Sequence, residues 1–143
     1  MRSDLVFYIK RMGNQLERMS YQYGQAAENR EISLMNLWVV DFLFDNQDRE
    51  IFPRDIEEEF SITRATASKM LNLMEKKELI ARKRVEGDGR MKQIVLLPGG
   101  FRLQKEAARV RNRMEEQICR NLTPKEREQF QMLSRKILAG MGD

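Results

Sequence analysis

Apolar side chains recur at helical spacing over most of the chain, and the longest run of this pattern lies near the N-terminus. Across residues 4–28 the apolar positions are separated by alternating steps of four and three residues: Leu5, Ile9, Met12, Leu16, Met19 and Tyr23. These steps place the side chains on one side of a helix, in the manner of a coiled coil. The pattern predicts a long helix that packs against another long helix, from the same chain or from a second copy.

Two shorter helices are expected next. Ser33 is suited to be the N-cap of a helix over 34–44, which the polar run "DNQDRE" ends. Ile51 and Phe52 could make a very short strand. Pro53 suits the first position of a third helix that ends near residue 60.

The pattern then changes to a tight turn at 61–63 and a fourth helix from Thr63, its predicted N-cap, to about residue 77. One side of this helix is apolar: Ala67, Met70, Leu71 and Met74. The opposite side carries small, polar and cationic residues: Ala65, Lys69, Asn72 and Lys76, with Arg64 and Ser68 at its edges. Two short helices joined by a tight turn, the second presenting such a face, have the geometry of a helix-turn-helix.

Alternating residues then predict a β-hairpin with strands over about 80–85 and 91–97 and turn residues between them. Pro98-Gly99-Gly100 should end the second strand. A long helix is expected over about 101–120, with one apolar face: Leu103, Ala107, Val110, Met114 and Ile118.

The sequence Thr123-Pro124-Lys125-Glu126 is a capping box with proline at the first helical position, a strong sign of a helix start. The last helix should run to about residue 138, with Phe130, Leu133 and Ile137 facing inward. The fold class is thus mainly α with a small β-hairpin.

Composition excludes several classes of site. The chain has 143 residues, which fits a single domain, with one cysteine, Cys119, and no histidine. An internal disulfide, a multi-cysteine zinc site and a histidine-dependent nucleophile are therefore impossible. No apolar run reaches the ~20 residues of a membrane span, and the N-terminus lacks a signal-peptide core, so the expected location is cytoplasmic. We expect no cofactor, no metal and no enzymatic activity.

Charge is unevenly distributed. Residues 41–60 have a net charge of −6, whereas residues 61–92, which hold the fourth helix and the hairpin, have a net charge of +5. A basic block of this kind is typical of proteins that bind polyanions, although a charge run can also be a solvated face.

A helix-turn-helix followed directly by a cationic hairpin is a winged helix. The helix can enter the major groove of B-DNA while the hairpin reaches the neighbouring minor groove or the backbone. Arg90, near the glycine-flanked tip, is suited to the electronegative minor groove, and Asp88 could hold its guanidinium. The alternative interpretation of the tip is a solvated turn in which Asp88-Gly89 simply makes the bend.

The run "ITRATASKMLNLMEKKELIARKRVEGDGRMKQIVLL" resembles the core of the MarR (multiple antibiotic resistance regulator) family of winged-helix transcription factors. The matching positions are Ile62-Thr63, Thr66, Met74-Glu75-Lys76-Lys77, Leu79-Ile80, Arg82, Asp88-Gly89-Arg90 and Leu97. Glu78 departs from the pattern, because the family usually has glycine there. That position often requires a positive φ, so local strain or a different turn is expected.

The resemblance implies a homodimer whose N- and C-terminal helices (1–30 and 101–143) interlock, with the winged helix over 31–100. A two-fold dimer would read a pseudo-palindromic operator in double-stranded DNA, with half-sites about one helical turn apart. We expect the regulator to be a repressor.

Individual roles follow from position. Arg64, Ala65, Ser68 and Lys69 lead into the groove and should lie nearest the base edges. Thr63 and Thr66 cap the helix or bind phosphate. The remaining cations, Lys76, Lys83 and Lys92, should contact the backbone. Arg82 and Arg84 either contact phosphate or support the hairpin.

Members of the family often bind small aromatic or anionic effectors. The residues Tyr8, Met12, Trp38 and Phe42 could line such a pocket, although aromatic and methionine stripes are more often plain core. Cys119 is either a redox sensor or a small buried hydrophobe.

Two other classes stay open on the sequence alone. One is a winged-helix module that binds DNA without sequence preference, or binds protein partners, and has no operator of its own. The other is an enzyme that uses carboxylates of the cluster Asp55–Glu59, which the helix dipole already explains as a solvated helix start.

Overall fold

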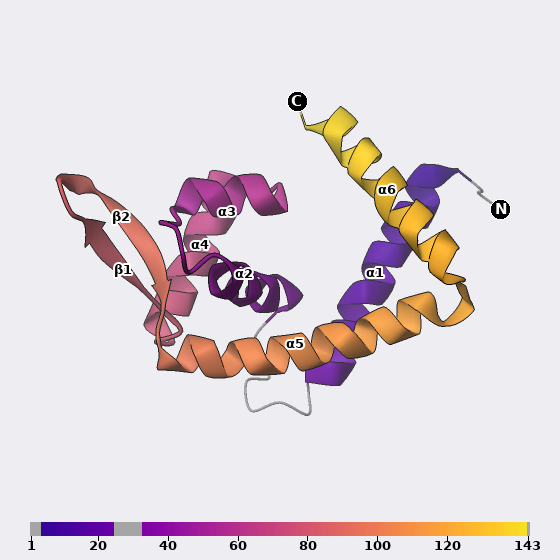
Figure 1. Ribbon diagram of the computed structural model, residues 1–143, viewed down its shortest axis with the longest axis horizontal. Coiled ribbons are helices and arrows are strands. Elements are labelled where there is room, and N and C mark those ends of the chain that lie inside the picture. Colours follow the sequence, from indigo (N-terminus) through magenta and orange to yellow (C-terminus); the bar gives the residue numbers. More distant parts are fainter. Residues whose placement is uncertain (1–3, 25–32, 143) are drawn as a thin grey trace.

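The computed structural model describes residues 4–24 and 33–142, and of Asp88 only the backbone is described. The chain is mainly helical with one antiparallel hairpin, as predicted (Figure 1). Its elements are α1 (Leu5–Gly24), α2 (Leu34–Asp45), α3 (Pro53–Phe60), α4 (Arg64–Lys76), β1 (Ile80–Val85), β2 (Asp88–Leu96), α5 (Pro98–Ile118), a 3₁₀ turn (Cys119–Asn121) and α6 (Pro124–Met141). Residues 25–28 of the predicted first helix lie outside the described part.

Side chains cap the helices where the sequence predicts. The hydroxyls of Ser33, Thr63 and Thr123 each accept a hydrogen bond from the backbone N–H three residues later. At α3 the N-cap is Phe52, which has no side-chain acceptor. There the Asp55 carboxylate accepts from the Phe52 backbone N–H at 2.8 Å. Each cap satisfies backbone N–H donors that the first helical turn leaves without a partner.

The core is built around α2, which packs against α5, α1 and the base of β2. Its apolar residues are buried on several sides: Leu34, Leu37, Val39, Val40 and Leu43. A helix that is apolar all round belongs in the middle of a fold. The stripe of α4 joins this core through Ala67, Leu71 and Met74, as predicted, while Met70 is half-buried.

The hairpin differs from the prediction at its tip. The register runs from Ile80↔Leu96 to Arg84↔Lys92 and then jumps to Val85↔Asp88. The turn is therefore only Glu86-Gly87, which requires the positive φ (91°) of Gly87. Residues 89–91 form a bulge on β2, which begins at residue 88 rather than 91. Arg90 lies in this bulge and not in the turn.

The predicted short strand at Ile51 and Phe52 is wrong. Ile51 makes one strand-like bond, in which its carbonyl accepts from the Ile94 backbone N–H at 2.7 Å. This single hydrogen bond holds residues 51–52 against β2, but it is not followed by the further bonds that would make a third strand.

The helix α5 begins at Pro98, three residues earlier than predicted. Proline fits the first helical turn because the N–H that it lacks would have no helical acceptor there. Gly100 is needed for packing: a Cβ at this position would lie 2.2 Å from the Leu79 carbonyl oxygen. The predicted apolar face is buried as far as Met114, but Ile118 is exposed.

The two terminal helices leave apolar surface uncovered. On α1 the seam is buried at Met19 and half-buried at Leu16 and Tyr23, whereas Leu5, Ile9 and Met12 are exposed. On α6 no described residue is buried. The prediction that Phe130, Leu133 and Ile137 face inward is therefore wrong for the single chain, in which they are 42–50% exposed. Figure 1 shows α6 turning back from the end of α5, apart from the core around α2.

Candidate nucleic-acid interface

The outer face of α4 is the first part of the interface. Because Ala67, Leu71 and Met74 are buried, the opposite side of α4 faces solvent. The side chains of this helix and its cap that were predicted to contact DNA are all exposed: Thr63, Arg64, Ala65, Thr66, Ser68, Lys69 and Lys76. The short α3 packs against α4. Ser61 ends α3 in the left-handed region (φ 52°), and this tight turn sets the angle between the two helices.

The N-terminal end of α4 is electrostatically positive. Its first turn contains no acidic residue and begins with the exposed Arg64. The N-terminus of a helix carries a partial positive charge from its unpaired N–H groups, and anions are stabilised there. The contrast is α3, whose first turn holds Asp55. The start of α4 thus favours a phosphate or an electronegative base edge.

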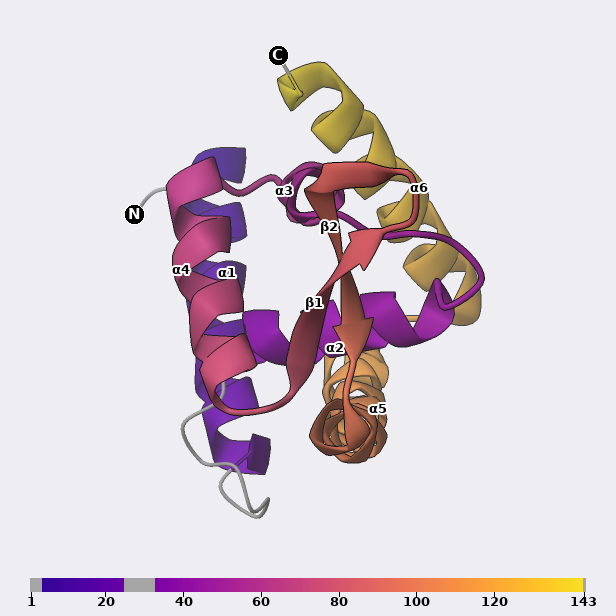
Figure 2. The same ribbon diagram turned by 90° about the vertical axis from the view of Figure 1, so that its left-hand side faces the viewer.

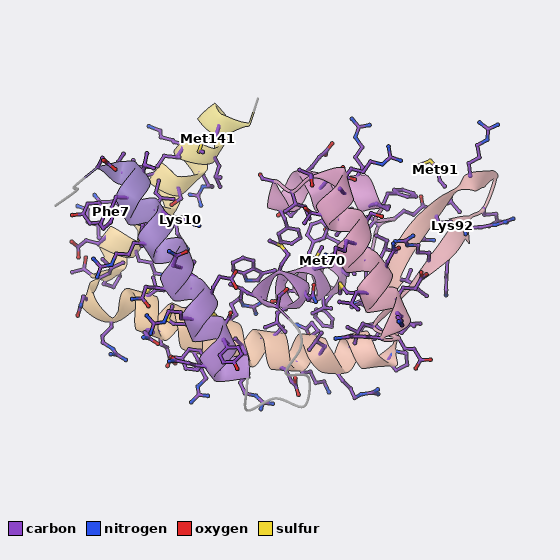
Figure 3. All side chains as sticks on the ribbon, turned by 180° about the vertical axis from the view of Figure 1, so that it is seen from behind. Phe7, Lys10, Met70, Met91, Lys92 and Met141 are labelled. Atoms are coloured by element: carbon purple, nitrogen blue, oxygen red, sulfur yellow. The ribbon has the colours of Figure 1, made fainter. Side chains whose placement is uncertain are left out.

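The hairpin is the second part of the interface. Seen from the side that Figure 2 presents, α4 and the two strands lie next to each other on one face of the molecule. The cations Lys83, Arg84, Arg90 and Lys92 are exposed. Lys92 lies on the outer half of the hairpin, away from the core (Figure 3). The predicted contact between Asp88 and Arg90 lies outside the described side chains.

Arg82 differs from the other hairpin cations. Its side chain is turned toward α4, where Nη2 donates to Oδ1 of Asn72 at 2.9 Å. Asn72 therefore belongs to the site as an acceptor, although the sequence showed it only as a polar residue on the outer face of α4. Asn72 and Arg82 are ten residues apart, with the end of α4 and a turn between them. No helical or strand periodicity in the sequence therefore predicts that they meet.

The four residues predicted to line an effector pocket lie on two helices, α1 and α2. Trp38 and Phe42 are half-buried on α2, where the Phe42 ring meets that of Phe60 edge-on at 5.9 Å. Tyr8 and Met12 are exposed on α1. An open hollow of about 530 Å³ lies along α1, and Phe7 and Lys10 among its lining residues are labelled in Figure 3. None of the four predicted residues lines it.

Cys119 is half-buried in the 3₁₀ turn between α5 and α6. Within the described ranges, no group of three or more acidic or cysteine side chains is placed to hold a metal ion. No helix in the part of the chain that the structure describes is long and apolar enough to cross a membrane.

Comparison with known proteins identifies the arrangement. The family model of the MarR family matches residues 31–91, which span α2 to the hairpin. No curated protein matches the sequence significantly. MarR from Oenococcus oeni PSU-1 is similar in structure, with 26% identity, a TM-score of 0.75 and coverage of 95% of this chain and 99% of that one.

Two further structures share the fold. MepR from S. aureus, solved in complex with DNA, has 22% identity and a TM-score of 0.82, with 96% of each chain covered. The haem sensor protein PefR from Streptococcus agalactiae, solved in complex with haem, has 20% identity and a TM-score of 0.67, with 98% of this chain and 95% of that one covered.

Proposed function

We propose that this chain, whose residues 31–91 match the model of the MarR family and whose structure is similar to MarR from Oenococcus oeni PSU-1, is a sequence-specific DNA-binding transcription regulator that works as one domain and binds a pseudo-palindromic operator as a homodimer. The observation that carries the proposal is the exposed outer face of α4 beside a hairpin with exposed cations (Figure 2). MepR, which has the same fold, was solved as a DNA complex. A regulator of this kind acts where the DNA is, which here means the cytoplasm.

The recognition helix of this proposal is α4, placed in the major groove. Arg64, Ala65, Ser68 and Lys69 are exposed in its first two turns. Arginine pairs with two acceptors of guanine, and the alanine methyl group can meet the methyl group of thymine. Thr63 already caps the helix, so Thr66 and Lys76 are left for phosphates.

The wing in this proposal places Arg90 in the adjacent minor groove. The bulge at residues 89–91 lies next to the tip, and bulges bend a strand and re-aim its side chains. A narrow groove with high negative potential can accept a guanidinium. Lys83, Arg84 and Lys92 are exposed along the strands and are assigned to phosphates. These contacts add affinity without reading sequence.

Homodimerisation is supported by the apolar surface that α1 and α6 leave uncovered. The exposed residues are Leu5, Val6, Ile9, Met12, Phe130, Met132, Leu133, Ile137, Leu138 and Met141. Large exposed apolar surfaces on otherwise charged proteins mark interfaces. A two-fold dimer through these helices would present two copies of α4, and the operator would contain two half-sites about one helical turn apart.

In this proposal the protein without an effector binds its operator and represses transcription. A small aromatic or anionic effector then makes the protein release the DNA. Trp38 and Phe42 are half-buried on α2, and Tyr8 and Met12 are exposed on α1, where a second copy could close over them. PefR, with the same fold, binds haem.

The test is a binding selection from random duplexes with the purified protein at two salt concentrations, repeated with Arg90→Ala. The control is Lys125→Ala, which removes an exposed cation at the start of α6. We expect an inverted repeat with half-sites near one turn apart, bound about tenfold or more weakly by Arg90→Ala and unchanged by Lys125→Ala. Binding without a motif that only weakens with salt would contradict the proposal and favour a general DNA-binding or partner-binding module.

A further inference from the structure

The hairpin is a two-stranded ribbon that projects from the core, so its angle to α4 is set where it joins the body of the protein (Figure 1). Isolated two-stranded hairpins are at best marginally stable, and contacts at the base must hold this one. Ile80 and Ile94 are buried there, whereas Lys83 and Arg84, farther out, are exposed. Only a short part of each strand is therefore available to fix the direction of the wing.

One cross-strand pair is held from both sides of the ribbon. Arg82 and Ile94 lie opposite each other in the register. The Ile94 backbone N–H points away from β1 and donates to the Ile51 carbonyl at 2.7 Å. The Arg82 side chain donates through Nη2 to Asn72 Oδ1 on α4 at 2.9 Å. The pair is thus connected to the segment before α3 on one side and to α4 on the other.

Arg82 is less exposed than the other cations of the hairpin. Its Nε is shielded from solvent and has no hydrogen-bond acceptor in the described structure. Arg84, two residues along β1 and so on the same face of the strand, is exposed because the hairpin has by then left the body of the protein. The same face thus carries a half-buried arginine near the base and an exposed arginine farther out.

We propose that Arg82 is a positioning residue: through Asn72 it fixes the angle between the wing and the recognition helix, so that both can engage DNA in one approach. This rests on the proposed function for its consequence in DNA binding. It assigns to Arg82 and Asn72 a role that differs from the phosphate contacts of Lys83 and Arg84. An arginine suits the role because its planar guanidinium can hold a fixed direction toward one acceptor.

The first test is hydrogen exchange of the hairpin amides in the protein without DNA. Arg82→Ala and Asn72→Ala should each speed exchange in β1 and β2 by about threefold or more, because each removes the same brace. The control is Glu75→Ala, an exposed residue one turn from Asn72 on α4, which should leave the exchange unchanged. Wild-type exchange in Asn72→Ala would overturn the proposal, as would equally fast exchange in Glu75→Ala.

The second test is a double-mutant cycle in affinity for the selected duplex, with melting temperatures to confirm folding. Each single substitution should weaken binding by about threefold to tenfold, and the double variant should be no weaker than the poorer single one. Lys83→Ala should weaken binding without faster exchange, as a phosphate contact does. Losses that multiply, or a loss with Arg82→Ala but none with Asn72→Ala, would assign Arg82 to phosphate and overturn the proposal.

The two tests separate failure of this inference from failure of the proposed function. The exchange measurement needs no operator, so it can establish the brace even if the selection finds no motif. Conversely, a clear operator together with unchanged exchange would leave the regulator intact and remove the role of Arg82.

Discussion

At the scale of the residue, Glu78 shows how local strain can be foreseen from a pattern. It stands where glycine is usual between the recognition helix and the first strand, and its backbone has φ 60°, in the left-handed region. A side chain with a Cβ is disfavoured there by about 1–2 kcal/mol. The expected strain is therefore present.

Replacing Glu78 by glycine should stabilise the protein by about 1 kcal/mol, because glycine adopts this φ without a steric cost. Urea unfolding monitored by circular dichroism measures the change. Glu75→Gly is the matched control: it lies inside α4 and should destabilise by about 1 kcal/mol. A loss of stability in both variants would show that Glu78 contributes a contact that outweighs its backbone strain.

Arg82 marks the limit of prediction at this scale. Its alternation with apolar neighbours indicated either phosphate contact or support of the hairpin, and the sequence could not choose between them. Which role Arg82 has depends on the position of Asn72 relative to the hairpin. The packing of the whole domain sets that position.

At the scale of the element, the sequence predicted the start of a helix well where a side chain caps its first turn. Ser33, Thr63 and Thr123 each cap the helix that the sequence assigned to them. The bulge in β2 and the early start of α5 were missed. Gly87 and Gly89 both permit a tight turn, and only the register decides between them, while Pro98 is as suitable for a helix start as for a strand end.

A polar bridge joins two of these elements. Asp41 is a buried residue of α2 that accepts from Gln104 Nε2 at 3.1 Å and pairs with the half-exposed Arg111, both on α5. It connects the winged helix to the long helix that leads toward α6. Its place within an apolar helical pattern concealed this role.

Arg111→Ala should destabilise the protein by about 2 kcal/mol, since the buried Asp41 carboxylate loses its cationic partner and keeps only the amide of Gln104. Arg109→Ala, which removes an exposed cation two residues away, should change stability by less than about 0.5 kcal/mol. Chemical unfolding of the two variants measures the difference. Equal effects would mean that the bridge contributes no more than a surface charge does.

At the scale of the whole molecule, the single chain leaves two apolar helix faces uncovered. The apolar faces of α6 and of the first half of α1 are regular along the sequence, and in the chain they remain exposed. The sequence predicted the apolar seam of α1 and the apolar face of α6, but it could not say whether a partner for either belongs to the same chain. In the proposed homodimer the second copy covers them.

Leu133→Lys should therefore shift the protein to monomers, because it places a charge in the middle of the exposed apolar face of α6. Glu128→Lys, an exposed change on the opposite side of the helix, is the control and should leave the oligomer unchanged. Sedimentation velocity of both variants gives the answer. A wild-type protein that is already monomeric at micromolar concentration would contradict the dimer.

The most direct test of operator binding by a dimer is a hydroxyl-radical footprint of the protein on its selected duplex, compared with that of Arg90→Ala. We expect two symmetric protected regions about one helical turn apart, with minor-groove protection beside each that Arg90→Ala removes. Continuous protection without a two-fold pattern, or a pattern that Arg90→Ala leaves intact, would contradict the claim that a dimer reads DNA with α4 and the wing together.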